Sequence, residues 1–251
     1  MTIPSTIYLY RIIHVDNLPF IVRSDKITCP SHSGANPDYI GIGDNSLIEH
    51  RRTMPIPLDP QGTLNDYVSF YFTKRSPMLY NIKNGFQNVT KRTQDEIIYL
   101  VTSYEKIAES GKPYIIYDGH AYHRMSRPFN TYEGLSYIDW RVIASNSWFD
   151  TEADPDRKRR KQAELLVYKS LPFNMVPGIA TFSEIACDKV KGIVEDVNKS
   201  IKVFVKKEWY YLLYKHDNFY SRKYSGVADG SPCEYCKYGR YNGQGSCISL
   251  P

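Results

Sequence analysis

Short runs of apolar and β-branched residues recur along the chain, separated by polar and turn-forming segments. Runs of about four to eight such residues are typical of β-strands. The pattern predicts strands at residues 7–13, 67–72, 96–102, 114–117, 164–168, 178–182 and 201–205. It predicts helices at residues 18–22, 104–109 and 184–199. Because strands outnumber helices and the two do not alternate strictly, we expect an α+β fold rather than a doubly wound parallel sheet.

Two polar segments interrupt this pattern. Residues 24–46 are rich in Gly, Pro, Ser, Asn and Asp and are expected to be mostly loop. Residues 119–163 form a longer polar segment, which we expect to be a functional loop or to contain short helices. From Trp209 onward the composition shifts to Tyr, Lys, Gly and Ser. We therefore assign one domain to residues 1–208 and a C-terminal extension, with no assigned role, to residues 209–251.

The composition narrows the class of protein. A chain of 251 residues with 42% apolar and 24% charged residues has an ordinary globular composition. No apolar stretch approaches the roughly 18 residues of a membrane helix, and the N-terminus lacks a basic region followed by an apolar run. We therefore expect neither a membrane partner nor secretion. The five cysteines are an odd number, which favours a reducing, cytoplasmic setting over a disulfide framework.

The net charge and the aromatic content are compatible with a polyanionic partner. The formal charge of +5 permits such a partner without requiring one, and 14% of the residues are aromatic, including 22 tyrosines. Aromatic rings next to basic groups suit stacking on unpaired bases. The alternative is that most of these tyrosines are half-buried strand residues, which is a common role for tyrosine in sheets.

A zinc site is a second hypothesis. The tail contains three cysteines at a C-x2-C-x10-C spacing, namely Cys233, Cys236 and Cys247. A structural zinc site needs four ligands, and Cys29 with His32 could complete the set across the fold. Free thiols are the favoured interpretation, because the tail alone is one ligand short.

The sequence lacks the motifs of several enzyme classes. It contains no P-loop, no G-x-G-x-x-G after a strand, no G-x-S-x-G and no H-E-x-x-H. ATP hydrolysis by a P-loop enzyme, α/β-hydrolase chemistry and zinc proteolysis are therefore excluded.

Four local groups remain that could have a chemical function. The first is the end of the strand at residues 10–18, which is polar and could bind a ligand or simply be solvated. The second is residues 42–52, where a glycine-containing loop precedes Arg51 and Arg52. Paired arginines bind pyrophosphate well, although on a surface helix they would be solvated.

The third group is residues 66–80, where aromatic residues alternate with basic ones at the end of a strand. This pattern suits a single-stranded nucleic acid, and a buried strand with a basic end is an equally good interpretation. The fourth group is residues 120–164, which contains a basic run at residues 157–161 and then Glu164 at the start of an apolar strand. A carboxylate there would be fixed and partly desolvated, as a group that stabilises a cationic sugar must be.

Taken in order, these pieces resemble the DarT family of DNA ADP-ribosyltransferase toxins. The matching segments are residues 11–18, 42–57, 62–72, 76–79, 118–122 and 162–164. The resemblance extends from about residue 7 to residue 205 and implies a compact ADP-ribosyltransferase fold, with a split β-sheet core, peripheral helices and a long substrate-binding loop. The sequence departs from the family at Ser69, where we expect proline, and in the tail beyond residue 209.

The resemblance implies an NAD-dependent transfer of ADP-ribose to a thymine base in single-stranded DNA, with release of nicotinamide. It assigns catalysis to Glu164, which holds the ribose 2′-hydroxyl, and to Arg51. A guanidinium stays protonated, so we expect Arg51 to stabilise the thymine anion and the NAD phosphates rather than act as a base. The NAD contacts implied are Arg11, Ile13, His14, Asn17, Gly43, Leu47, Arg51 and Tyr71.

For nucleic acid, the resemblance implies contacts from His120, Met78, Arg75, Trp148, Arg157 and Arg160. It also implies a toxin that blocks DNA replication in a bacterial or phage-infected cell, and a macrodomain antitoxin that reverses the modification. Two alternatives stay open. One is a relative that acts on RNA or on guanine, and the other is a non-catalytic module that binds single strands.

Overall fold

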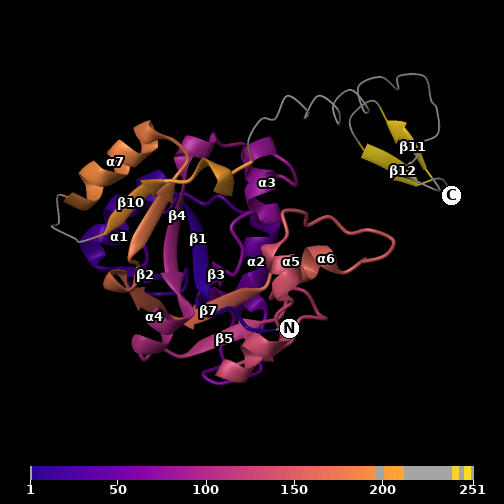
Figure 1. Ribbon diagram of the computed structural model, residues 1–251, viewed down its shortest axis with the longest axis horizontal. Coiled ribbons are helices and arrows are strands. Elements are labelled where there is room, and N and C mark those ends of the chain that lie inside the picture. Colours follow the sequence, from indigo (N-terminus) through magenta and orange to yellow (C-terminus); the bar gives the residue numbers. More distant parts are fainter. Residues whose placement is uncertain (1, 196–200, 212–238, 243–245, 250–251) are drawn as a thin grey trace. The chain divides into compact units, whose positions relative to one another are not determined.

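The computed structural model describes residues 2–195, 201–211, 239–242 and 246–249 (Figure 1). It divides the chain into two compact units, residues 1–211 and residues 212–251. In the second unit, strands β11 (Gly239–Asn242) and β12 (Ser246–Ser249) form an antiparallel pair. All elements described below belong to the first unit.

An eight-stranded sheet forms the centre of the first unit, in the order β10-β9-β4-β1-β3-β7-β5-β6. Neighbouring strands are antiparallel, except that β10 is parallel to β9. All strands expected from the sequence are present, and β6 is an additional two-residue strand. The strands are β1 (Tyr8–His14), β3 (Tyr67–Tyr71), β4 (Ile97–Ser103), β5 (Tyr114–Tyr117), β6 (Pro128–Phe129), β7 (Glu164–Tyr168), β9 (Gly178–Thr181) and β10 (Lys202–Val205).

The sheet is split between β1 and β3. Strand β1 pairs with β4 along its whole length, whereas it meets β3 only where Tyr10 faces Tyr71. One half of the sheet is therefore β10-β9-β4-β1, and the other is β3-β7-β5-β6. Just beyond the single bridge, Arg11 Nη1 donates a hydrogen bond to the carbonyl oxygen of Ser69 at 3.0 Å. The α+β class and the split sheet agree with the fold expected from the sequence.

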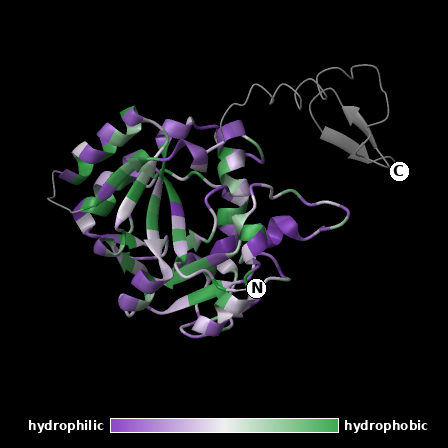
Figure 2. Cartoon of the chain, viewed as in Figure 1, coloured by the Kyte–Doolittle hydropathy of each residue, from purple (hydrophilic) through white to green (hydrophobic). Residues whose placement is uncertain are grey.

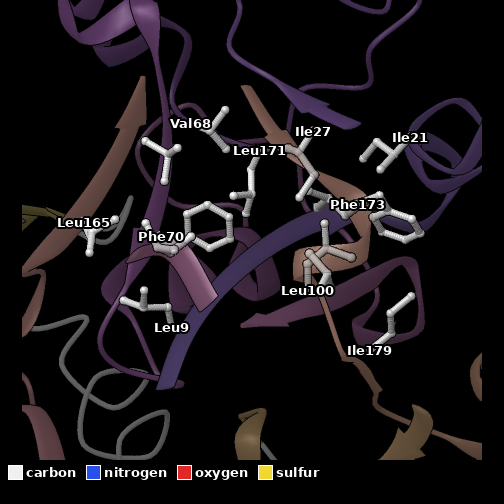
Figure 3. Packing of buried hydrophobic residues seen from close by; sticks show 14 of the residues in the cluster. Leu9, Ile21, Ile27, Val68, Phe70, Leu100, Leu165, Leu171, Phe173 and Ile179 are labelled. Atoms are coloured by element: carbon white, nitrogen blue, oxygen red, sulfur yellow. The ribbon is translucent and has the colours of Figure 1, made fainter. Parts of the chain in front are cut away.

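The main core lies on one face of the sheet, where apolar side chains from both halves meet (Figure 3). Leu9, Val68, Leu100 and Leu165 are all fully buried there. Helices α1 (Leu18–Ser24) and α7 (Glu184–Glu195) pack against this core with their apolar faces and leave their polar faces outside (Figure 2). This burial fixes the strands that surround the split.

Two helices near the split were not expected from the sequence. Helix α2 (Asn45–Thr53) has no buried residue and thus no apolar period to detect, and the carboxylate of Asp44 caps its start. Helix α3 (Pro77–Asn84) begins at a Ser76 cap followed by proline and ends at Gly85, which has a positive φ of 72°. Both caps are sequence signals that were readable without any periodicity.

The remaining elements are short. The long segment at residues 119–163 contains short helices, as one of the two expectations allowed. Strands β2 (Lys26–Thr28) and β8 (Ser170–Pro172) form a separate antiparallel pair. Each strand has three residues, which is too short for an apolar pattern to reveal it. The other helices are α4 (Tyr104–Glu109), α5 (Trp140–Ala144), α6 (Arg157–Lys161), and the 3₁₀ turns η1 (Val15–Asn17), η2 (Leu64–Asp66), η3 (Gln94–Glu96), η4 (Tyr132–Tyr137), η5 (Phe173–Met175) and η6 (Lys207–Trp209). None of the helices in the described ranges is long and apolar enough to cross a membrane.

The first unit extends three residues past the boundary that composition suggested. Tyr210 is fully buried, and its hydroxyl donates to the carbonyl oxygens of Ile97 at 2.9 Å and Ala180 at 3.2 Å. The ring of Trp209 packs edge-on against Tyr10, with ring centroids 5.3 Å apart. Residues 209–211 thus tie the end of this unit to β4, β9 and β1.

Candidate active site

A cavity of about 800 Å³ lies at the split between β1 and β3. Its wall is built from these strands, from the start of β7, from helices α2 and α3, and from the loop that begins after β5. The predicted site residues that line it are Arg11, Gly43, Leu47, Arg51, Tyr71, Met78, His120 and Glu164. A cavity of this size can hold a dinucleotide.

Glu164 is the first residue of β7 and is fully buried. Its Oε1 accepts a hydrogen bond from the backbone N–H of Ala121 at 2.7 Å. Its Oε2 is buried and has no hydrogen-bond partner among the described residues. A buried carboxylate oxygen without a donor is costly, so this atom is a ready acceptor for a hydroxyl group of a ligand.

Strand pairing brings two tyrosines beside this carboxylate. In the register of the sheet, Glu164 faces Tyr71 on β3 and Tyr117 on β5. Burial, with the charge of Glu164 as a further cause, raises the pKa of Tyr71 well above its usual value and that of Tyr117 to about 12. Both phenols are therefore protonated at neutral pH, and that of Tyr71 donates to the sulfur of Met78 at 3.8 Å.

Arg51 reaches the same point from the last turn of α2. Its Nη1 lies 3.5 Å from Glu164 Oε1, and its Nη2 donates to the hydroxyl of Ser69 at 2.9 Å. Only 16% of its side chain is exposed. The neighbouring Arg52 lies at the edge of the cavity, but more than half of its side chain is exposed and it pairs with Glu49 at 3.0 Å. The two arginines therefore have different environments, and only Arg51 is fixed beside the carboxylate.

His120 lines the cavity next to this pair. Burial lowers the pKa of its imidazole to about 4, and the positive charge of Arg51 acts in the same direction against the opposing charge of Glu164. The imidazole is therefore neutral at pH 7 and can accept a hydrogen bond at one ring nitrogen. Its backbone N–H donates to the carbonyl oxygen of Arg159 at 3.0 Å, which fixes the start of the loop.

Three predicted NAD contacts, in β1 and the following turn η1, do not line the cavity. Ile13 is fully buried in the main core. His14 is buried as well, where its Nδ1 caps η1 by accepting from Asp16 N at 3.2 Å. Asn17 supports the cavity wall from behind, because its side-chain amide exchanges two hydrogen bonds of 2.9 Å with the backbone of Ile40. The polar residues at this strand end therefore point into the fold, where His14 caps η1 and Asn17 holds the loop at Ile40.

The basic run at residues 157–161 forms α6, and most of its charge is neutralised within the fold. Arg160 forms ion pairs with Asp139 and Asp154, and Arg157 pairs with Asp154 at 3.1 Å. These two arginines, predicted as phosphate contacts, do not line the cavity. Lys158 does line it, so the cation of this run that faces the cavity is not one of the two predicted arginines.

The two other predicted nucleic-acid contacts also lie outside the cavity. Arg75 lines a separate cavity of about 680 Å³, together with Lys74. Trp148 is only 6% exposed, and it supports the half-exposed ring of Phe149. A buried indole cannot itself present a face to a base.

Sequence reasoning missed three contributors to the site. Ser69 was noted only because it is not proline, yet it holds Arg51 through its hydroxyl. Ala121 contributes a backbone N–H to Glu164, which no side-chain pattern reveals. Lys158 was hidden within the basic run, where only the fold distinguishes the cation that faces the cavity.

A metal centre finds no support in the part of the chain that the structure describes. There, no group of three or more His, Cys, Asp or Glu residues could hold a metal ion. Cys29 is a buried free thiol whose sulfur lies 3.3 Å from the hydroxyl of Ser31. Cys233 and Cys236 lie outside the described residues, and Cys247 lies in β12.

Comparison with known sequences places these features in a family. The family model described as "ssDNA thymidine ADP-ribosyltransferase, DarT" matches residues 10–211. A DNA ADP-ribosyl transferase of Thermus sp. (strain 2.9) is 34% identical over 212 residues, which are 84% of this chain and 99% of that protein. A DNA ADP-ribosyl transferase of Escherichia coli O127:H6 is 31% identical over 208 residues, which are 83% of this chain and 95% of that protein.

Solved structures agree with the sequence comparison. Thermus sp. 2.9 DarT in complex with ADP-ribosylated ssDNA superimposes with a TM-score of 0.78 at 33% identity, covering 84% of this chain and 99% of that chain. The same protein in complex with NAD+ gives a TM-score of 0.74 at 32% identity, covering 84% of this chain and 100% of that chain. Over the length covered, the fold of this chain is therefore that of these proteins.

Proposed function

This chain belongs to the DarT family of single-stranded-DNA thymidine ADP-ribosyltransferases, and from that premise we propose that it transfers ADP-ribose from NAD+ to thymine in single-stranded DNA. The observation that carries the proposal is the buried Oε2 of Glu164, which has no hydrogen-bond partner within the described part of the chain and lies in a cavity large enough for NAD+. The bound NAD+ of the related Thermus protein supports the same substrate here.

Glu164 has the chemical properties that the first step needs. The bond between nicotinamide and ribose breaks, its electrons leave with neutral nicotinamide, and the ribose develops a positive charge. Oε2 of Glu164 accepts a hydrogen bond from the ribose 2′-hydroxyl, and its negative charge stabilises the cation. Such fixed electrostatic contacts act most strongly in a water-poor site, and Glu164 is fully buried.

Arg51 stabilises the nucleophile and does not act as a base. A ring nitrogen of thymine forms the new bond to the ribose, and its N–H proton passes to solvent water. Because a guanidinium remains protonated, Arg51 lowers the cost of the thymine anion by its charge, and it also attracts the NAD phosphates. Its hydrogen bonds to Ser69 and Glu164 hold the charge in place.

The other cavity-lining residues position the two substrates. Arg11 faces the cavity with a buried Nε that has no hydrogen-bond partner among the described residues, and we assign it to the nicotinamide end. Gly43 and Leu47 form the wall along NAD+, while Tyr71 and Met78 pack on the nicotinamide or the target base. The neutral imidazole of His120 accepts a hydrogen bond from the base.

Single-stranded DNA is the expected form of the substrate. In a duplex, the ring nitrogen of thymine is engaged in the base pair. Extracting the base costs a few kcal/mol of pairing and stacking, which an unpaired strand does not lose. The complex of the related Thermus protein with ADP-ribosylated ssDNA supports this choice.

The proposal is tested by incubating the protein with NAD+ and a thymine-containing oligonucleotide, and weighing the product. We expect the wild type to add the mass of ADP-ribose, and Glu164→Gln to reduce the rate by at least about 100-fold, which corresponds to roughly 3 kcal/mol. Glu49→Gln is the matched control, because this glutamate is exposed on α2, and it should leave the rate unchanged.

The identity of the acceptor is decided in the same assay. Competition between DNA and RNA oligonucleotides of equal sequence, followed by digestion to nucleosides, identifies the modified base. An adduct on thymidine supports the proposal. An adduct on guanosine or on RNA would contradict it, and so would oligonucleotide binding without release of nicotinamide.

We also propose a partner that reverses the modification. An ADP-ribose on thymine blocks its pairing face with a bulky anionic group, so unchecked activity in the cytoplasm would stop replication. A macrodomain antitoxin that removes ADP-ribose is the partner that this chemistry requires. Adding a macrodomain hydrolase to the modified oligonucleotide should restore the original mass, and persistence of the adduct would count against this partner.

A further inference from the structure

Four aromatic residues form a cluster that we call the aromatic patch: Tyr80, Phe86, Trp148 and Phe149. Tyr80 lies on α3 and Phe86 just after it, whereas Trp148 and Phe149 lie between α5 and α6. The rings of Trp148 and Phe149 are stacked, with centroids 3.9 Å apart and an interplanar angle of 24°. Trp148 is 6% exposed, whereas Phe149 is 52% exposed. The indole therefore covers one face of the phenyl ring, and the other face is open to solvent.

The aromatic patch is held in place by the fold. The ring of Tyr80 on α3 packs edge-on against Trp148 at 5.4 Å and against Phe149 at 6.1 Å. The carboxylate of Asp150 accepts a hydrogen bond from the backbone N–H of Lys158 at 2.7 Å, which fixes the residue after Phe149 to α6. An exposed ring that is ordered before a ligand arrives loses little entropy on binding.

The aromatic patch adjoins the active-site cavity. The Nζ of Lys158 lies 5.8 Å from the centre of the Trp148 ring, and Lys158 also lines the cavity. Helix α3 carries Tyr80 on the patch and carries Met78 and Asn81 in the cavity wall. In Figure 1, α3 lies close to the segment between α5 and α6, in agreement with these ring contacts. A DNA strand that leaves the cavity would thus meet the ammonium group of Lys158 and then the open face of the Phe149 ring.

We propose that Phe149 is the stacking platform for a nucleotide next to the target thymine, and that Lys158 contacts the intervening phosphate. The proposal rests on the function proposed above, and it identifies where the flanking strand binds. Every base has a π-face, so a phenyl platform binds a flanking nucleotide with little dependence on its sequence. A half-exposed phenyl ring, stacked on an indole that lies beside a cavity-lining ammonium group, matches the chemistry of a single-stranded nucleic acid.

The dependence of activity on oligonucleotide length tests the proposal. In the wild type, KM for DNA should fall when nucleotides are added on either side of a short thymine-containing oligonucleotide. In Phe149→Ala, the KM for the longer oligonucleotide should rise on the order of tenfold, with the loss in KM rather than in kcat. Phe149→Tyr keeps a stacking ring and should restore the wild-type KM.

A control variant and a binding measurement separate stacking from misfolding. Tyr132 has the same 52% exposure but packs on Tyr104 of α4, so Tyr132→Ala should leave KM for every oligonucleotide unchanged. In Glu164→Gln protein, adding Phe149→Ala should weaken binding of the long oligonucleotide to a similar extent. Equal losses for short and long oligonucleotides, or an unchanged KM, would overturn the platform. Failure of the wild type to modify any oligonucleotide would instead overturn the proposed function itself.

Discussion

Ser69 accepts hydrogen bonds from two arginines that come from distant parts of the chain, one at its hydroxyl and one at its carbonyl oxygen. Arg51 donates to the hydroxyl at 2.9 Å, and Arg11 donates to the carbonyl oxygen at 3.0 Å. Ser69 lies at the position where the resemblance to the family leads us to expect proline, which has no hydroxyl. In this protein the guanidinium of Arg51 therefore has a support that a proline could not provide.

Replacing Ser69 tests this support. In Ser69→Ala the guanidinium of Arg51 loses a charge-assisted hydrogen bond, so kcat for transfer should fall about tenfold, which corresponds to roughly 1.4 kcal/mol. Ser69→Thr keeps a hydroxyl and should retain most of the activity. Steady-state kinetics with saturating NAD+ provide the measurement. If the alanine variant matched the wild type in kcat and in both KM values, Ser69 would have no positioning role.

At the scale of elements, the carboxylate of Glu96 in the turn η3 links the end of β1 to the start of β4 through its hydrogen bond with His14. Burial of Glu96 would raise its pKa, but hydrogen bonds from Thr93, His14 and Arg92 together lower the pKa to about 2. The folded protein therefore holds the charged form more tightly than the unfolded chain does. This contribution to stability is complete above pH 4.5 and is lost as the pH falls towards about 2.

Glu96→Gln tests this pH dependence. Because about a third of the carboxylate is exposed, we expect a loss in the free energy of unfolding on the order of 1 kcal/mol at pH 7. The difference from the wild type should shrink between pH 4.5 and pH 2. Urea unfolding at several pH values measures both quantities, with Glu105→Gln on the exposed side of α4 as the control. A difference that does not change with pH would contradict the assignment.

An element was predicted from the sequence only where its buried residues form a recognisable pattern of apolar positions. The strands around the split were predictable because their apolar residues are buried on both sides of the sheet, as for the successive residues Leu165 and Leu166 of β7. Helix α2 has no buried residue, so periodicity could not reveal it, although it positions Arg51. The inward turn of His14 and the ion pairs of Arg160 were also not predictable, because a local pattern does not indicate that His14 meets Glu96 or that Arg160 meets Asp139.

For the molecule as a whole, the end of the first unit is a structural part of the fold. Tyr210 is fully buried and donates hydrogen bonds to β4 and β9, and the carbonyl oxygen of Trp209 accepts one from Tyr99 at 3.1 Å. The change in composition at Trp209 gave no sign of this, because composition does not distinguish a buried aromatic residue from an exposed one. The boundary of the folded unit is therefore set by packing.

Two truncated chains test this boundary. A chain that ends after Tyr211 should unfold cooperatively near the midpoint of the first unit in the full-length protein. A chain that ends after Glu208 loses a buried tyrosine and its hydrogen bonds, and should be less stable by on the order of 3–5 kcal/mol. Thermal unfolding followed by circular dichroism compares them. Equal midpoints for the two truncated chains would show that residues 209–211 do not support the fold.

The split sheet brings together the candidate site residues, which are far apart in the sequence. Because β1 meets β3 only at Tyr10 and Tyr71, the cavity opens directly beside Glu164 on the neighbouring strand β7. The sequence predicted the carboxylate and the arginine of this site, since a known family shares their order. The backbone N–H of Ala121 and the hydroxyl of Ser69 became visible only with the fold.

A crystal structure of this protein with bound NAD+ tests the central claim most directly, through the distance between Glu164 Oε2 and the 2′-hydroxyl of the nicotinamide ribose. We predict a hydrogen bond, with an oxygen–oxygen distance of about 2.5–3.0 Å. NAD+ bound elsewhere, or bound in the cavity with its nicotinamide ribose out of reach of Glu164, would contradict the account.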